Sequence, residues 1–80
     1  MPQFFFYWPP YRVQKVEDHG LTTEEVEEVV QSPVETGFSR KSGLPLARGY
    51  TSTGRWIVCI YRMSDAVTVE VITAFEPEEA

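Results

Sequence analysis

The stretch Trp56-Ile57-Val58-Cys59-Ile60-Tyr61 decides the fold class of this chain. It consists of aromatic, β-branched and small apolar residues without a polar interruption, which is typical of a strand covered on both faces. We therefore predict a central strand over residues 55–63. The segment Ser52-Thr53-Gly54 comes directly before it, and a glycine in that position suits a tight hairpin connection.

Further strands are predicted on both sides of this central segment. Residues 45–51 place Leu46, Arg48 and Tyr50 on one face, and residues 67–75 alternate valines with polar residues. A weaker strand is predicted over 36–41. The aromatic run in 3–8 predicts a first strand, and because its residues do not alternate we expect cover on both of its faces.

Two helices are predicted between the first strand and the others. Residues 11–19 form a short helical pattern, and Thr22 with Glu25 fits a capping box at the start of the next helix. Ser32-Pro33 ends that helix. The order β-α-α-β-β-β(-β) predicts an α+β fold with two helices packed on one face of an antiparallel sheet. We expect one domain over 1–80, with 76–80 as a polar, frayed tail.

Composition excludes several classes of protein. The chain has 80 residues, a formal net charge of −5, one cysteine and one histidine. A single cysteine cannot form an internal disulfide, so a reducing, cytoplasmic location is expected. No apolar run approaches the about 20 residues of a transmembrane helix. One histidine and one cysteine are too few ligands for the usual zinc sites, so no metal is expected. No glycine-rich phosphate loop is present, so no cofactor is expected either.

Charge is segregated along the chain. Residues 36–64 hold five basic residues and no acidic one, whereas the rest holds two basic residues and all twelve acidic ones. One part of the fold is therefore expected to present positive charge. The alternative is that the basic side chains decorate a sheet and pair with the acidic helix.

The basic residues of this segment suggest phosphate chemistry. Metal-free RNA cleavage needs cations for the developing phosphorane, and Arg48, Arg55 and Arg62 are the candidates for catalytic residues. Tyr50 shares a strand face with Arg48 and could stack on a base, and Arg55 could lie close to both across the hairpin. The alternative is that Arg55 only decorates the turn and Tyr50 packs as a rim residue.

Other side chains have a functional and a structural interpretation. His19 is a weak candidate for a general base, or it ends the first helix as a cap. Arg40 and Lys41 join Tyr50 as candidate substrate-binding residues. Glu70 is an acid–base group or, by preference, an ion-pair partner of Arg55 or Arg62. Cys59 is expected to be a small buried apolar residue rather than a nucleophile.

Two motifs resemble a known family. The segment His19-Gly20-Leu21-Thr22-Thr23-Glu24-Glu25 is similar to the "HG-hydrophobic-T/S-x-E-E" helix opening of the BrnT-like toxins, which are RelE-superfamily ribonucleases of type II toxin–antitoxin pairs. Gly49 to Arg55 is similar to the "G-x-T-x-x-G-R" hairpin of that family. The resemblance runs over about residues 4–76. It implies the same scaffold, a metal-independent endoribonuclease activity on RNA and neutralisation by a protein antitoxin.

The end of the chain departs from that family. The toxins typically follow their last strand with paired arginines and a basic helix, whereas this chain has Phe75-Glu76-Pro77-Glu78-Glu79. We therefore expect a ribonuclease toxin or a degenerate relative. The alternative is a non-enzymatic protein-interaction module on the same scaffold, which binds a protein through an open sheet face or an edge strand. A homodimer is a further possible assembly.

Overall fold

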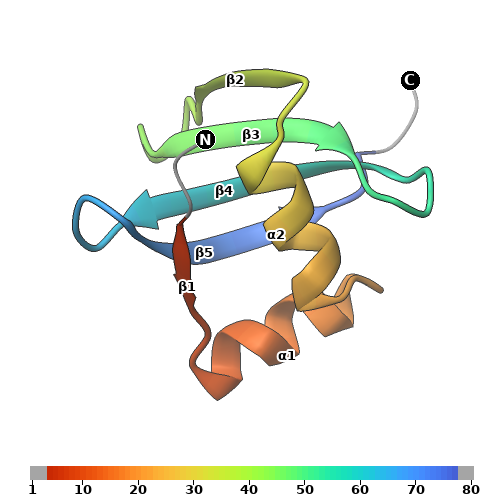
Figure 1. Cartoon of the computed structure of the whole chain (residues 1–80), viewed down its shortest axis with the longest axis horizontal. Helices are drawn as coiled ribbons and strands as arrows, with labels where there is room; N and C mark the ends of the chain where they lie inside the picture. Colours follow the sequence, from red (N-terminus) through yellow and green to blue (C-terminus); the bar gives the residue numbers. More distant parts are fainter. Residues whose placement is uncertain (1–3, 78–80) are drawn as a thin grey trace.

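The structure is a computed structural model, and it describes residues 4–77 of the chain. A five-stranded sheet carries two helices, as Figure 1 shows. The elements in chain order are β1 (Phe5–Tyr7), α1 (Pro10–Asp18), α2 (Thr23–Gln31), β2 (Glu35–Phe38), β3 (Pro45–Tyr50), β4 (Trp56–Met63) and β5 (Thr68–Phe75). The predicted α+β class and element order are confirmed.

The strand order in the sheet is β1-β5-β4-β3-β2, so β4 lies at the centre as its apolar sequence predicts. The strands β2 to β5 pair in antiparallel fashion. The strand β1 pairs with β5 in parallel, so the sheet is mixed and the expectation of a purely antiparallel sheet is wrong at this edge. A parallel pair needs a long crossover connection, and the helices and strands between β1 and β5 supply it.

The strand β1 is an edge strand with one covered face. Phe6 packs against the core, whereas the side chains of Phe5 and Tyr7 are 71% and 56% exposed. The expectation that both faces of this segment are covered is therefore wrong. An unbroken aromatic run does not by itself distinguish a central strand from an edge strand.

The helix α2 begins at the predicted capping box. The hydroxyl of Thr22 accepts a hydrogen bond from the Glu25 N–H at 3.1 Å, and the Glu25 carboxylate accepts one from the Thr22 N–H at 3.1 Å. Each contact satisfies a backbone N–H that the helix itself leaves free. The capping box fixes the start of α2 and so the position of its buried valines.

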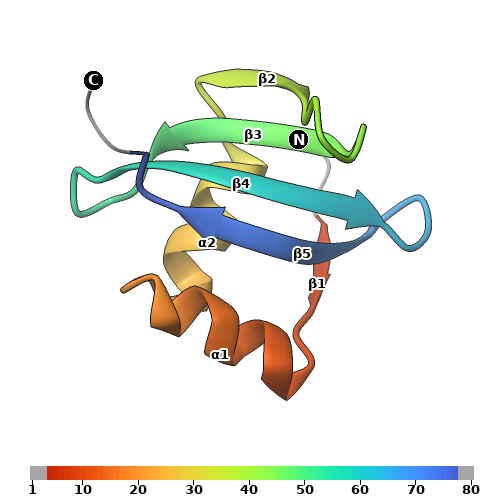
Figure 2. The ribbon, with the colours of Figure 1, turned by 180° about the vertical axis from the view of Figure 1, so that it is seen from behind.

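Both helices contribute to a core on one face of the sheet. Val16 of α1 and Val26 and Val29 of α2 are almost fully buried, in one cluster with Ile57 and Cys59 of β4. No helix lies over the opposite face within residues 4–77, as the view from behind shows (Figure 2). We call this surface the open face; strand alternation and the β3–β4 register assign to it Leu46, Arg48, Tyr50, Trp56, Val58 and Ile60.

The strand β2 is shorter than predicted, and the expectation of a strand through Lys41 is wrong. The Ser39 N–H donates to the Leu44 carbonyl at 2.8 Å, and the Gly43 N–H donates to the Ser39 carbonyl at 2.7 Å. Gly43 has φ 72°, a value that glycine adopts without a Cβ penalty. The chain therefore turns directly after Ser39, and Arg40 lies in the turn.

Candidate functional site

Arg48 lies in the middle of the open face. It is opposite Val58 in the β3–β4 register, and its guanidinium is 4.0 Å from the Glu35 carboxylate of β2. The side chain is 41% exposed, yet its Nε atom is buried without a hydrogen-bond partner in the described part of the chain. A buried N–H without an acceptor is costly, so Arg48 has an unused donor on this face.

Two aromatic rings stand beside Arg48. Tyr50 is 63% exposed, and its ring meets that of Trp56 edge to face, with centroids 4.8 Å apart and an interplanar angle of 63°. The register places these two residues directly opposite each other. The predicted neighbourhood of Arg48 and Tyr50 is confirmed. Trp56 was not among the predicted site residues, although its alternation with Val58 in the sequence could have assigned it to this face.

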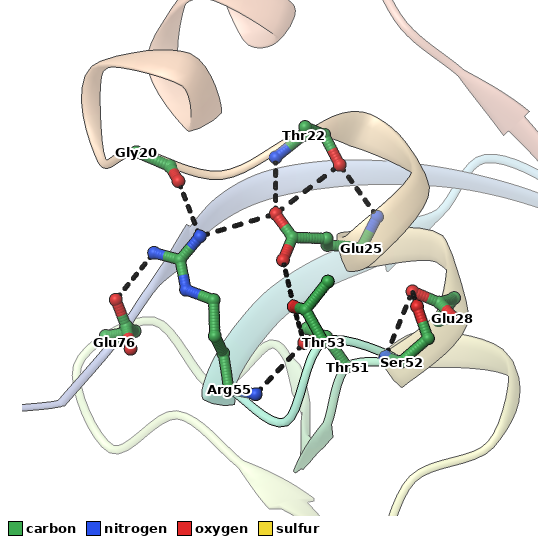
Figure 3. A network of polar contacts seen from close by, with 9 residues as sticks. All are labelled: Gly20, Thr22, Glu25, Glu28, Thr51, Ser52, Thr53, Arg55 and Glu76. Carbon is green, nitrogen blue, oxygen red and sulfur yellow. Dashed lines mark hydrogen bonds and ion pairs between the residues drawn. The ribbon is translucent and has the colours of Figure 1, made fainter.

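Arg55 points away from Arg48 and Tyr50, and the expectation that it lies beside them is wrong. Its guanidinium donates to the Gly20 carbonyl at 2.8 Å and to Glu25 at 3.5 Å, on the helix side of the sheet (Figure 3). Arg55 comes one position before Trp56, so strand alternation directs the two side chains to opposite faces.

The same guanidinium holds the end of the described chain. Arg55 Nη2 lies 2.6 Å from the Glu76 carboxylate, and this hydrogen bond raises the pKa of Arg55 and lowers that of Glu76. Glu76 belongs to the tail that was expected to fray, and residues 78–80 of that tail lie outside the described residues. The role of Arg55 here is to join α2, the hairpin and the end of β5.

The hairpin between β3 and β4 is held to α2 by carboxylates. The Thr53 hydroxyl donates to Glu25 at 3.0 Å, and the Ser52 hydroxyl donates to Glu28 at 3.2 Å (Figure 3). A hollow of about 440 Å³ opens next to these contacts. Its lining residues are Glu28, Gln31, Ser32, Tyr50, Thr51 and Ser52. These contacts make the G-x-T-x-x-G-R segment a structural hairpin, docked onto the first turns of α2.

Arg62 pairs with Glu70, as the preferred interpretation of Glu70 predicts. The shortest contact is 2.8 Å, and a second arginine, Arg12 of α1, approaches the same carboxylate at 3.2 Å. Glu70 is only 3% exposed, and the hydrogen bond from Arg62 is the main cause that lowers its pKa. The participation of Arg12 was not predicted, because periodicity does not show which helix passes the end of a strand.

His19, Arg40 and Lys41 do not join Arg48. His19 follows the last residue of α1, where its N–H donates to the Val16 carbonyl at 3.1 Å, and its ring centroid lies 6.5 Å from that of Phe75. His19 therefore lies where the structural interpretation places it, at the C-terminal cap of the first helix. Arg40 and Lys41 are exposed in the turn after β2, and neither forms an ion pair within residues 4–77.

Cys59 is a buried free thiol in the core. Its Sγ atom lies 4.0 Å from the Val26 carbonyl, and burial raises its pKa to about 12. A thiol with this pKa is protonated near neutral pH, so Cys59 has the properties of a small apolar residue. The expectation that it is buried is confirmed.

The described residues contain no group of three or more His, Cys, Asp and Glu side chains that could hold a metal ion. Neither of the helices in residues 4–77 is long and apolar enough to cross a membrane. Comparisons with protein families, with characterised proteins and with solved structures gave no match to this chain. The BrnT-like resemblance therefore rests on its two motifs and stays a prediction.

Proposed function

We propose that this chain is a non-enzymatic protein-interaction module that binds its partner through the open face. The observation that carries the proposal is the arrangement of the three candidate arginines. Arg55 lies on the helix side of the sheet, whereas Arg48 and Arg62 pair with two different carboxylates, so each of the three arginines is within 4.0 Å of a carboxylate. A phosphorane needs several cations that converge on one point, whereas these arginines pair with separate carboxylates.

The open face has the chemistry of a protein-binding surface. Its apolar side chains continue along β3 and β4 from a pair of aromatic rings, and aromatic and arginine residues are those most often found at the centres of protein interfaces. The partly exposed guanidinium of Arg48 lies among them. A partner that carries a carboxylate flanked by apolar side chains would pair with the exposed part of the Arg48 guanidinium, and would cover Tyr50 and Trp56 at the same time.

Site-specific photo-crosslinking in cells tests this proposal. A photoreactive phenylalanine analogue is placed at Tyr50, and as a matched control at Tyr11 of α1, since both side chains are 63% exposed. We expect a discrete protein adduct from position 50 alone, and its loss in the Arg48→Glu background. Equal adducts from both positions, or none from position 50, would contradict the proposal.

A nuclease assay tests the non-enzymatic part of the proposal. Purified chain is incubated with total RNA, with an Arg48→Ala variant beside it. We expect intact RNA in both samples. Cleavage by the parent that disappears in the Arg48→Ala variant would favour the second candidate function.

That second candidate is a ribonuclease toxin of the BrnT-like kind, or a degenerate relative, with a protein antitoxin and a cytoplasmic place of action. The observation that favours it is the cation of Arg48 beside two rings on which bases could stack. RNA binding that falls steeply with salt would support it. Loss of that binding in Arg48→Ala, but not in Lys15→Ala on α1, would assign it to the open face. Absence of RNA binding even at low salt would exclude the ribonuclease function.

A further inference from the structure

We propose that a second copy of this chain pairs with the outer edge of β2, antiparallel and about a two-fold axis at Gly37. The strand β2 is the last in the sheet order and has β3 on one side only. Within residues 4–77 no other strand lies along its second side, which forms the margin of the sheet in both views (Figures 1 and 2). A free strand edge offers backbone groups to another chain. This assembly goes beyond the proposed function, because it uses the edge and leaves the open face available.

The backbone pattern identifies which groups are free. The Ser39 N–H donates to Leu44 and so points toward β3. Because direction alternates along a strand, the N–H and C=O groups of Thr36 and Phe38 point away from β3. Pro45, which lies opposite Phe38 in the register, has no N–H to donate to it, which agrees with this assignment. Each copy therefore presents two donors and two acceptors.

The side chains of β2 leave this edge accessible. Phe38 is 75% exposed. A Cβ added at Gly37 would meet no atom within 4 Å, so this part of the edge is open space. Proteins protect such edges with short strands, charged side chains, proline or a bulge; β2, with the sequence Glu-Thr-Gly-Phe, is short and carries one glutamate, but has no lysine and no proline.

A two-fold axis at Gly37 uses all of the free groups. It places Thr36 of one copy opposite Phe38 of the other, and the same pair repeats on the far side of the axis. Each pair exchanges two hydrogen bonds, so the four donors of the dimer meet its four acceptors. The two Phe38 rings then lie on one face, diagonally across the axis and within reach of each other.

Charge also favours a second copy in this register. Glu35 stands at the start of β2, and the exposed Arg40 and Lys41 follow its end. Antiparallel pairing about Gly37 brings Glu35 opposite Ser39 of the second copy and next to its Arg40. An axis at Glu35 would instead place this carboxylate against its own copy. Opposite charges therefore meet at both ends of the paired strands, although the net charge of each chain is −5.

The paired segment is short, so the dimer is weak. Stable interfaces bury about 1,200–2,000 Å² in total, and two four-residue strands with one exposed ring each cover less than this. We expect association in the micromolar to millimolar range. Sedimentation equilibrium of the full chain over that range of concentration measures it.

Two kinds of variant test the register. Thr36→Pro removes an outward N–H without removing a hydrogen bond to β3, and we expect a folded monomer by circular dichroism and sedimentation. Glu35→Lys and Arg40→Glu should each weaken the dimer at least about tenfold, because each places like charges together. The double variant should restore it. Glu17→Lys, in the exposed part of α1, changes net charge as Glu35→Lys does and should leave the dimer intact.

Three results would overturn the proposal. The first is a parent chain that stays monomeric at every concentration. The second is a Thr36→Pro variant that dimerises as strongly as the parent. The third is a folded Glu35→Lys/Arg40→Glu variant that does not recover association. The crosslinking experiment uses a chain that carries none of these dimer substitutions, so failure of the dimer would leave its result at the open face unaffected.

Discussion

Arg62 donates two hydrogen bonds, of 2.8 and 3.1 Å, to a single oxygen of Glu70, whose side chain is almost fully buried. The other carboxylate oxygen accepts from Arg12 at 3.2 Å. Arg12 also donates to the Ile72 carbonyl at 3.3 Å, beside the register shift between β4 and β5. The Glu70 carboxylate thus joins α1, β4 and β5, and the two arginines that pair with it stabilise the fold.

This cluster predicts acid sensitivity. The pKa of Glu70 is lowered in the folded state, so its contribution to the free energy of unfolding is present above the unfolded pKa of the carboxyl, near 4.5. It is lost as the pH falls through the lower, folded pKa. Glu70→Gln should destabilise the chain by about 1–3 kcal/mol at neutral pH. The free energy of unfolding of the Glu70→Gln variant should also fall less than that of the parent below pH 4.5. Urea unfolding at a series of pH values measures both. Parallel pH profiles for variant and parent would contradict this account.

The capping box predicts a selective cost at the start of α2. Thr22→Ala removes the acceptor for the Glu25 N–H and should lower the free energy of unfolding by about 1 kcal/mol. Thr23→Ala is the matched control, because Thr23 is the first residue of the helix and makes no capping contact through its side chain. Urea unfolding followed by circular dichroism compares the two. Equal losses in both variants would show that the cap contributes nothing specific.

The sequence predicts this fold best where a local rule decides the structure. The Thr22–Glu25 capping box is a contact between residues three apart, so the sequence itself contains both partners. The central position of β4 follows from its apolar composition. The parallel pairing of β1 could not be predicted in this way, because it joins segments separated by more than sixty residues.

The candidate site shows the same division. Arg48 and Tyr50 were predicted to share a face, because two positions along a strand always do. The direction of Arg55 follows from the same alternation, counted from Trp56, once the strand boundary is known. The pairings of Arg55 with Glu76 and of Arg12 with Glu70 depend on tertiary packing, and no periodicity in the sequence reveals them.

Substitution by alanine should have different effects at Gly37 of β2 and at Gly49 of β3. A Cβ at Gly49 would lie 3.3 Å from the Val34 backbone nitrogen and 3.5 Å from a Val29 methyl, whereas one at Gly37 would meet nothing within 4 Å. Gly49→Ala should therefore lower the free energy of unfolding by about 1–3 kcal/mol, as overpacking does. Gly37→Ala should change it by less than about 0.5 kcal/mol. Thermal unfolding at low protein concentration, where the chain is monomeric, makes the comparison. A neutral Gly49→Ala would show that the 33–34 segment moves freely away from β3.

The reactivity of the buried Cys59 thiol reports on exposure of the core. The thiol is 0% exposed and its pKa is raised to about 12 by burial, so the native chain has almost no thiolate near neutral pH. Alkylation by iodoacetamide at pH 7.5 should be slow in buffer, and one equivalent should react promptly in concentrated urea, as followed by mass spectrometry. Ile57→Ala, which removes a fully buried neighbour in the same strand, should lower stability by about 2–5 kcal/mol and speed native-state labelling accordingly. Prompt labelling of the native parent would mean that β4 is accessible to reagent, and would contradict its central place in the sheet.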